Sequence, residues 1–321
     1  MTTRRRLVGW LAAVGAGALG ACDSTPVRPD DTPRRPGVFA GSRSVAGGFL
    51  VPPGSPFGAL ARPGTGAYVK LQAPAALALR GNDLAVADLA TGRLWRVDLA
   101  LGTLSPIPGA PVSPQTRLAL GPDLSVWLLD TAARQVLRFA RDGRLMQTWR
   151  GGPDAPSPVG LALADGGATL LVADASTRQW LELRGAGGRA LAVAPGGRDP
   201  AQLRGVDDIA VAGDRVLLLD RLAGVVHVLQ RDGRGLDRLG EGQLAQPVAI
   251  AADRAGRIAV LDGQDGSLKW LTSGRPARVI DAQALGVQQP AGIALDEGWL
   301  AVSDRLAGQV LIHRLPAEAA P

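Results

Sequence analysis

One segment of forty-odd residues recurs six times along this chain of 321 residues, and it constrains the fold more than any other feature. Each copy holds Leu or Ile, then Ala, and usually a further aliphatic residue. An apolar run that ends in Asp follows within twelve residues of that Ala. The runs end, at spacings of 42 to 46 residues, at Asp88, Asp130, Asp174, Asp220, Asp262 and Asp304. A repeat of this length indicates stacked modules, such as a solenoid or a propeller.

Each copy predicts four short strands. The Leu-Ala-Leu segment is the first strand, a turn with Gly, Asn or Asp follows, and the run that ends in Asp is the second. Apolar residues six and nine positions after the Asp mark a third strand, and a looser fourth strand follows, as at residues 145–149. Four strands in each period predict a β-propeller blade. The 43 Gly and 24 Pro residues agree with the many turns that such blades require.

The pattern of proline, aliphatic-Ala-aliphatic, a strand ending in Asp, a Gly/Arg loop and a further aliphatic strand resembles the NHL repeat over residues 67–315. The resemblance implies an all-β fold, a six-bladed β-propeller with four-stranded antiparallel blades. No Trp-Asp dipeptide and no Tyr-Trp-Thr-Asp run occurs, which argues against WD40 and receptor-type propellers. The Asn-rich loop usual in the family is missing after the Asp, so these repeats are divergent.

The ends of the repeat region predict how the ring closes. Only 17 residues follow Asp304, enough for a third strand at residues 309–313 but not for a fourth. We therefore expect an N-terminal strand at residues 67–71 to complete the last blade, which protects the ring from opening. The expected organisation is a signal peptide at residues 1–21, a tether at 22–66, the propeller at 67–315 and a tail at 316–321.

The first residues predict export. Three arginines at residues 4–6 precede a 15-residue apolar run that ends before Cys22, the only Cys of the chain. The run is short for a membrane span and suits a signal peptide. Residues 19–22, Leu-Gly-Ala-Cys, resemble the lipobox of bacterial lipoproteins, which implies cleavage before Cys22 and lipidation of its thiol. An ordinary signal peptide with an incidental Cys is the alternative.

The export route and the segment after Cys22 are less specific. Residues 3–8 resemble a twin-arginine motif, and a generic basic region is the alternative. Residues 23–66 are rich in Pro, Gly and Ser, a composition typical of a spacer. We expect the protein in the bacterial cell envelope, anchored in the membrane through Cys22 and facing the periplasm or the cell exterior.

The charge carries little information about function. The net charge is +6, but three of the arginines lie in the expected signal peptide, and Lys70 and Lys269 are the only lysines. The remaining excess of about +3 is too small to indicate a nucleic-acid partner. We expect none.

The candidate site comes from departures from the repeat. The residue before the Leu or Ile of the first strand is small in four copies, but it is Arg117 in the second and Asp208 in the fourth, where Asp207 adds a carboxylate. The first strand of a propeller blade is innermost, so these side chains are predicted to face one another at the channel mouth as a ligand site. A charge pair that plugs the channel is the alternative. The six strand-end Asp residues are expected to be structural, accepting backbone hydrogen bonds from the next loop.

Few residues suit enzyme chemistry. The chain has one Asn, Asn82, in a turn, and two His, His227 and His313, in third strands away from the channel. Propeller enzymes that use calcium or zinc need such groups at the channel, so we expect no metal and no cofactor. We expect a monomeric binding module for an envelope protein or glycan, with a hydrolase or lyase at the channel mouth as the alternative. The binding face would carry the first-strand starts and the loop arginines that follow the Asp residues, at positions 134, 178, 221 and 305.

Overall fold

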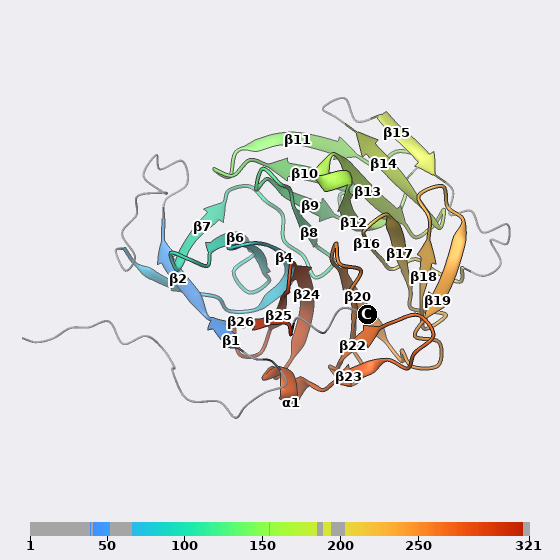
Figure 1. Ribbon diagram of the computed structural model, residues 1–321. Coiled ribbons are helices and arrows are strands. Elements are labelled where there is room, and N and C mark those ends of the chain that lie inside the picture. The colour runs from blue at the N-terminus through green and yellow to red at the C-terminus, as the bar shows by residue number, and fades with distance from the viewer. Residues whose placement is uncertain are drawn as a thin grey trace, which may run out of the picture. The chain divides into compact units, whose positions relative to one another are not determined.

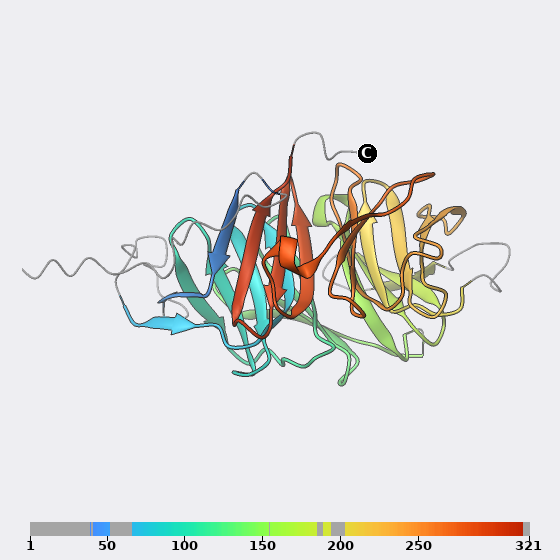
Figure 2. The ribbon, with the colours of Figure 1, turned by 90° about the horizontal axis from the view of Figure 1, so that it is seen from below.

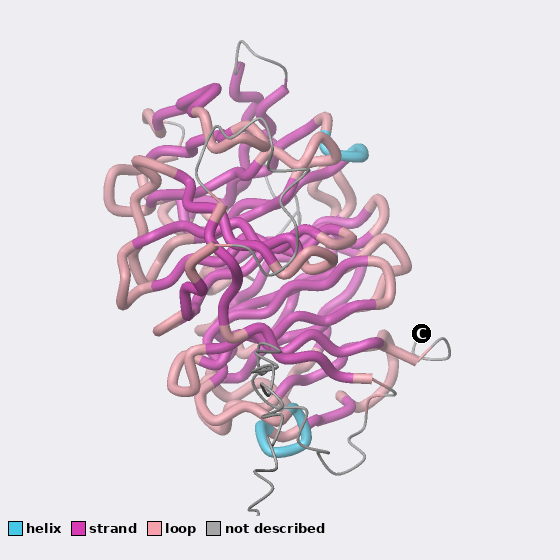
Figure 3. Tube along the Cα trace, turned by 90° about the vertical axis from the view of Figure 1, so that its left-hand side faces the viewer, coloured by secondary structure: helices cyan, strands magenta, loops and turns pink. Residues whose placement is uncertain are grey.

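The computed structural model describes residues 39, 41–51, 66–153, 155–184, 189–193 and 203–316, which form 26 strands and two short helical turns. Figure 3 shows how completely strands dominate this part of the chain. The expected signal peptide, Cys22, much of the expected tether and residues 317–321 lie outside the described residues. Among the described residues, no helix is long and apolar enough to cross a membrane.

The described strands form six sheets whose innermost strands contact one another in a closed ring, β4, β8, β12, β16, β20 and β24, which confirms the β-propeller fold (Figure 1). Blade one holds, from the axis outward, β4 (Pro74–Arg80), β5 (Asp83–Asp88), β6 (Arg93–Asp98) and β7 (Thr103–Ile107). Blade two holds β8 (Arg117–Leu120), β9 (Val126–Asp130), β10 (Gln135–Phe139) and β11 (Leu145–Arg150). Blade three holds β12 (Pro158–Ala164), β13 (Thr169–Asp174), β14 (Gln179–Arg184) and β15 (Arg189–Val193), with the 3-10 turn η1 (Asp165–Gly167).

The other three blades repeat this order. Blade four holds β16 (Asp208–Ala212), β17 (Arg215–Asp220), β18 (Val225–Leu229) and β19 (Gly235–Leu239). Blade five holds β20 (Pro247–Ala252), β21 (Ile258–Asp262), β22 (Leu268–Leu271) and β23 (Arg278–Ile280). Blade six follows the short helix α1 (Ala282–Leu285) and holds β24 (Pro290–Asp296), β25 (Trp299–Asp304), β26 (Gln309–Arg314) and β1 (Ser42–Val45).

The core lies between neighbouring blades. Each apolar cluster draws on two blades, as where Leu129 and Val136 of blade two pack against Leu170 and Leu183 of blade three. A blade is therefore covered on both faces, and its second strand is a continuous apolar run rather than an alternating one. All six residues of β13 are buried for this reason.

The ring closes as a shared sheet, but with a strand other than the one we expected. Residues 42–45, in β1, pair antiparallel with β26 and complete blade six, with Ser42 opposite His313 (Figure 2). The expected closing segment instead forms β3 (Tyr68–Lys70), which pairs with β2 (Gly47–Leu50). Strand β2 in turn pairs in parallel with β7 of blade one.

Chain length explains the difference. The outer strand of a blade lies about 14 Å, three strand spacings, from the inner strand. If residues 67–71 were the outer strand of blade six, only Gln72 and Ala73 would remain to reach β4, a span of roughly 10 Å. Strands β1 and β2 belong to propeller sheets, although we expected their residues to be part of the tether. The propeller therefore begins before residue 67, the start that we expected.

Candidate functional site

The inner strands all start on one face of the propeller, and the second strands all end on that same face. The six strand-end Asp residues lie there, so we call it the aspartate face. All six are buried. Asp88 shows the pattern: its carboxylate accepts hydrogen bonds from the amides of Gln72 and Ala73 before β4, and from those of Ala90 and Thr91 after β5. Such a carboxylate ties together the two loops of its blade, the structural role that the repetition predicts. Blade two differs: within the described residues, the carboxylate of Asp130 accepts a backbone hydrogen bond only from Ala133, in the loop that follows β9.

In blades four and five this carboxylate also contacts a basic side chain seven residues further along. Asp220 Oδ2 lies 3.3 Å from His227 Nε2, and Asp262 Oδ2 accepts a hydrogen bond of 2.6 Å from Lys269 Nζ. Burial raises the pKa of Asp262, but the bonds from Lys269 and three backbone amides outweigh it and hold the pKa below its ordinary value. His227 therefore supports a loop carboxylate rather than a ligand site.

The predicted pair at the centre of the aspartate face is present. Arg117 starts β8 and Asp208 starts β16, and their Nε and Oδ2 atoms lie 3.7 Å apart although blade three stands between their blades. Gly160 of β12 makes this possible. A Cβ atom at Gly160 would lie 2.9 Å from Asp208 Oδ1, so the carboxylate occupies the space that a side chain would fill.

The third predicted residue does not join them. Asp207 accepts a hydrogen bond of 2.9 Å from the amide of Arg221 and lies 3.2 Å from its Nε, in the loop region of blade four. Asp208 is instead buried, and its carboxylate accepts bonds from the amides of Ile209 and Ile250. Burial raises the pKa of Asp208 despite the opposing charge of Arg117.

The central channel holds a cavity of about 230 Å³ that lies beyond this pair, toward the opposite face. Arg117, Asp207 and Asp208 do not line it. Its walls are the later residues of the inner strands, in the segments 77–80, 118–120, 161–164, 209–211, 250–252 and 293–296. Because each inner strand is paired on one side only, its free edge exposes backbone amides and carbonyls to the cavity.

Charged side chains surround the cavity where the inner strands end. They are Arg80, Asp165, Asp253, Arg254 and Asp296. Asp253 is neutralised by Arg257, 2.5 Å away, and Asp296 accepts a bond of 2.7 Å from the amide of Gly81. In the ranges that the structure describes, no three His, Cys, Asp or Glu side chains converge on a point where they would hold a metal ion.

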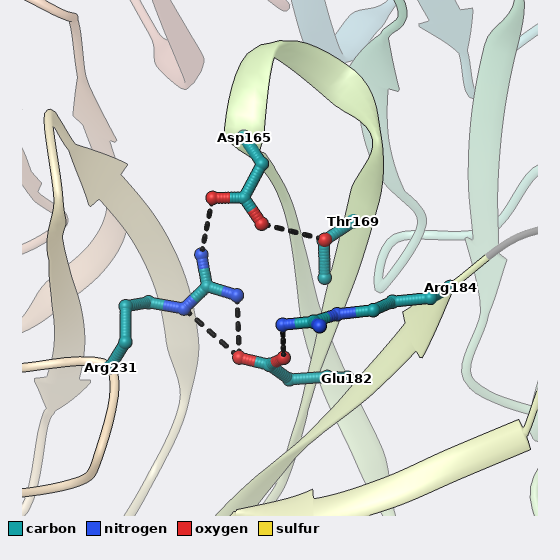
Figure 4. Close-up of polar contacts among 5 residues, drawn as sticks. All are labelled: Asp165, Thr169, Glu182, Arg184 and Arg231. Carbon is teal, nitrogen blue, oxygen red and sulfur yellow. Dashed lines mark hydrogen bonds and ion pairs between the residues drawn. The ribbon is translucent and has the colours of Figure 1, made fainter.

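One of these residues belongs to a network between blades three and four (Figure 4). Arg231 donates to Glu182 Oε1 through Nε at 3.0 Å, and its Nη1 lies 3.2 Å from Asp165 Oδ1. Thr169 and Arg184 bind the remaining oxygens of the two acids. The network holds Asp165 at the cavity rim, and the bond from Thr169 contributes most to lowering its pKa.

Sequence reasoning missed two features of the aspartate face. Gly160 and Gly292, the small residues that align with Arg117 and Asp208 in the repeat, are sites of close backbone approach: a Cβ at Gly292 would lie 2.2 Å from Ala75 O of the neighbouring blade. The second feature is a pentapeptide, Asp-Arg-Leu-Ala-Gly, which occurs at residues 220–224 and again at 304–308. Comparison of the six turns would have found it.

Comparison with known proteins supports the fold alone. No family model and no curated protein sequence matches the chain. The structure is similar to that of a catalytically inactive virginiamycin B lyase from Staphylococcus aureus with quinupristin, at 14% identity and a TM-score of 0.56, covering 76% of this chain and 80% of the lyase. A protein of unknown function from Bacteroides thetaiotaomicron is similar at 13% identity and a TM-score of 0.57, covering 85% of this chain and 76% of that one.

Proposed function

We propose that this protein is an exported, lipid-anchored propeller of NHL type that binds a protein partner in the bacterial cell envelope through its aspartate face. The observation that carries the proposal is the exposure of Leu222 and Leu306, at 69% and 67% the most exposed large apolar side chains of the described residues. Each lies in the turn after a strand-end Asp, on the aspartate face. The predicted lipobox at Cys22 supports the envelope location.

The turn does not require these leucines. The same position, two residues after the Asp, is held in the other four blades by small or polar residues: Ala90, Ala132, Ser176 and Gln264. An apolar side chain that is exposed to water does not stabilise the fold. It contributes favourable free energy only when a partner covers it and removes its surface from water. Val248 of blade five, between the two turns in the ring, is 38% exposed and extends the apolar character of this side of the face.

Charge indicates the chemistry of the partner. Each leucine follows an arginine, Arg221 or Arg305, and exposed Arg204 precedes β16. Arg305 contacts Gln289 but has no ion pair within the described residues, whereas Arg221 is paired with Asp207. Guanidinium groups beside exposed leucines suit a segment with both carboxylate and apolar side chains.

The test is site-specific photocrosslinking in the cell envelope with the full chain. A photoreactive residue at 222 or at 306 should capture one and the same protein, and Arg221→Glu with Arg305→Glu should abolish capture from both positions. Positions 145 and 236, also exposed leucines but on the outer strands β11 and β19, are the matched controls and should capture nothing.

Other outcomes would overturn the proposal. Equal capture from all four positions would show non-specific contact, and a captured product that resists protease but not glycosidase would show a glycan partner. Turnover on a substrate panel that is lost in Arg117→Ala/Asp208→Ala would support the alternative function, a hydrolase or lyase at the channel mouth. Recovery of a Cys22→Ser variant in the membrane fraction would contradict the lipid anchor.

A further inference from the structure

We infer that a second cavity, between blades two and three, binds a small aromatic ligand that is neutral or anionic. The cavity has a volume of about 230 Å³ and is separate from the central channel. It is lined by Trp127, Val136, Arg138, Trp149, Leu170 and Leu183, together with Gln147 and the backbone turn at residues 167–168. The inference does not depend on the proposed docking face.

Strand register builds one wall of the cavity. On the side of blade two that faces blade three, Trp127, Arg138 and Gln147 stand side by side on β9, β10 and β11, and Val136 and Trp149 form the next row. Two indole rings therefore share one wall with a guanidinium group. Blade three supplies the opposite wall with the buried leucines Leu170 and Leu183.

Trp127 departs from the repeat. The position three residues before the strand-end Asp is Ala or Leu in the five other blades, and those residues are fully buried: Ala85, Leu171, Leu217, Ala259 and Ala301. Trp127 is only half-buried. Trp127 is larger than any of these residues, and its side chain lines the cavity rather than being closed off by the next blade.

The interface between blades one and two shows how the cavity could have been filled. Phe139, nine residues after Asp130, projects from blade two toward blade one and is buried with the core of that interface. Its counterpart in blade three, nine residues after Asp174, is Leu183. The aliphatic side chain is smaller than a phenyl ring, so space remains beside the two tryptophans.

The turn over the cavity is fixed by a close contact. Gly167 has a left-handed backbone, and a Cβ atom there would lie 2.3 Å from Pro122 Cδ in the turn of blade two. The turn of blade three is therefore pressed onto blade two, and its residues 167–168 line this end of the cavity.

The lining selects an aromatic ring. A cavity of about 150 Å³ can hold benzene, and this larger cavity, with its mixed polar and apolar lining, offers two indole rings for stacking or edge contacts with an aromatic ring. Pockets for drug-sized ligands are larger, about 300–1,000 Å³, so this one suits a single ring system. The Arg138 guanidinium, 4.8 Å from the centre of the Trp127 ring, already occupies the cation–π position on that ring, which disfavours a second cation there.

Arg138 is held in place, which makes that selectivity a fixed property. Its Nη2 donates to Asp123 Oδ2 at 2.7 Å and its Nε to Ser125 Oγ at 3.2 Å. These two bonds orient the guanidinium over the Trp127 ring.

The test uses benzyl alcohol, benzoate and benzylamine, which share one ring and differ in charge, with tryptophan fluorescence of the purified full chain as readout. We expect saturable binding of the first two and binding of benzylamine about tenfold weaker. Leu183→Phe, which copies Phe139, should abolish binding and leave the melting temperature equal or higher. Trp149→Leu, at a half-buried position that tolerates change, should weaken binding, whereas Trp299→Leu on blade six should not.

Three results would each overturn the inference. One is the absence of saturable binding by wild-type protein up to the solubility limit of the probes. Another is unchanged affinity in both Leu183→Phe and Trp149→Leu. The third is tighter binding of benzylamine than of benzyl alcohol.

Discussion

Asp208 of blade four and Arg117 of blade two form an ion pair of 3.7 Å directly over Gly160 of the blade between them. Three blades thus meet at the start of their inner strands. The carboxylate is buried and the guanidinium partly exposed, so the pair lies under the surface of the aspartate face rather than in the channel cavity. The carboxylate fits there because Gly160 has no Cβ atom.

Gly160→Ala should destabilise the protein. The new Cβ would lie 2.9 Å from Ile209 N and 3.0 Å from Asp208 Cα, both backbone atoms that cannot move alone. Overpacking of this kind costs about 1–3 kcal/mol. Urea unfolding would measure the loss. Gly235→Ala, at a glycine with open space around it, is the control, and equal unfolding free energies for the two variants would contradict the packing argument.

Asp208→Asn should change how stability depends on pH. The pKa of Asp208 is raised in the folded state by burial, so the native protein holds this proton more tightly than the unfolded chain. Its contribution is fully present below the unfolded pKa and is lost as the pH rises through the folded pKa. The free energy of unfolding of wild type, minus that of Asp208→Asn, should therefore fall as the pH rises above about 4, the ordinary range of a carboxyl pKa. Arg117→Gln, which removes the opposing charge, should extend the fall to higher pH, and a constant difference would refute the linkage.

Asp262→Ala should be far more costly than Lys269→Leu. Removing the carboxylate leaves a buried ammonium and three backbone amides without their acceptor, a loss of about 3–5 kcal/mol. Leucine in place of Lys269 matches Leu181 and Leu311, which hold the same position, seven residues after the Asp, in blades three and six. The substitution leaves the hydrogen bonds from the backbone amides to Asp262 intact. Thermal and urea unfolding of both variants would check the order; a reversed order would mean that the ion pair, and not the loop contacts, is the main role of Asp262.

Val45→Asp should weaken closure of the ring. Val45 lies in β1 opposite Val310 and is buried in the cluster between blades six and one. Loss of the apolar contact and burial of a carboxylate should together cost about 3 kcal/mol or more. Ser44→Asp, at the neighbouring exposed position, should cost little. Similar melting temperatures for the two variants would argue that β1 does not close the ring in solution.

What the amino-acid sequence determined by itself was local and periodic. The aliphatic-Ala strands, the turns and the six aspartates could be predicted because the groups concerned lie within about twenty residues of one another, as where Asp88 binds the amides at residues 72–73 and 90–91. Six copies of such a unit predict a propeller, since no blade can bury both of its faces alone.

What only the tertiary structure decided was how distant segments meet. Strand β1 pairs with β26, from which most of the chain separates it in sequence. That β1 rather than residues 67–71 closes blade six follows from the distance between outer and inner strands, not from any sequence pattern. Arg117 and Asp208 were predicted to face one another, but the separation of Asp207 from them and the role of Gly160 arise from register between blades. The cavity beside Trp127 and Trp149 has the same origin, because it depends on the size of Leu183 in the next blade.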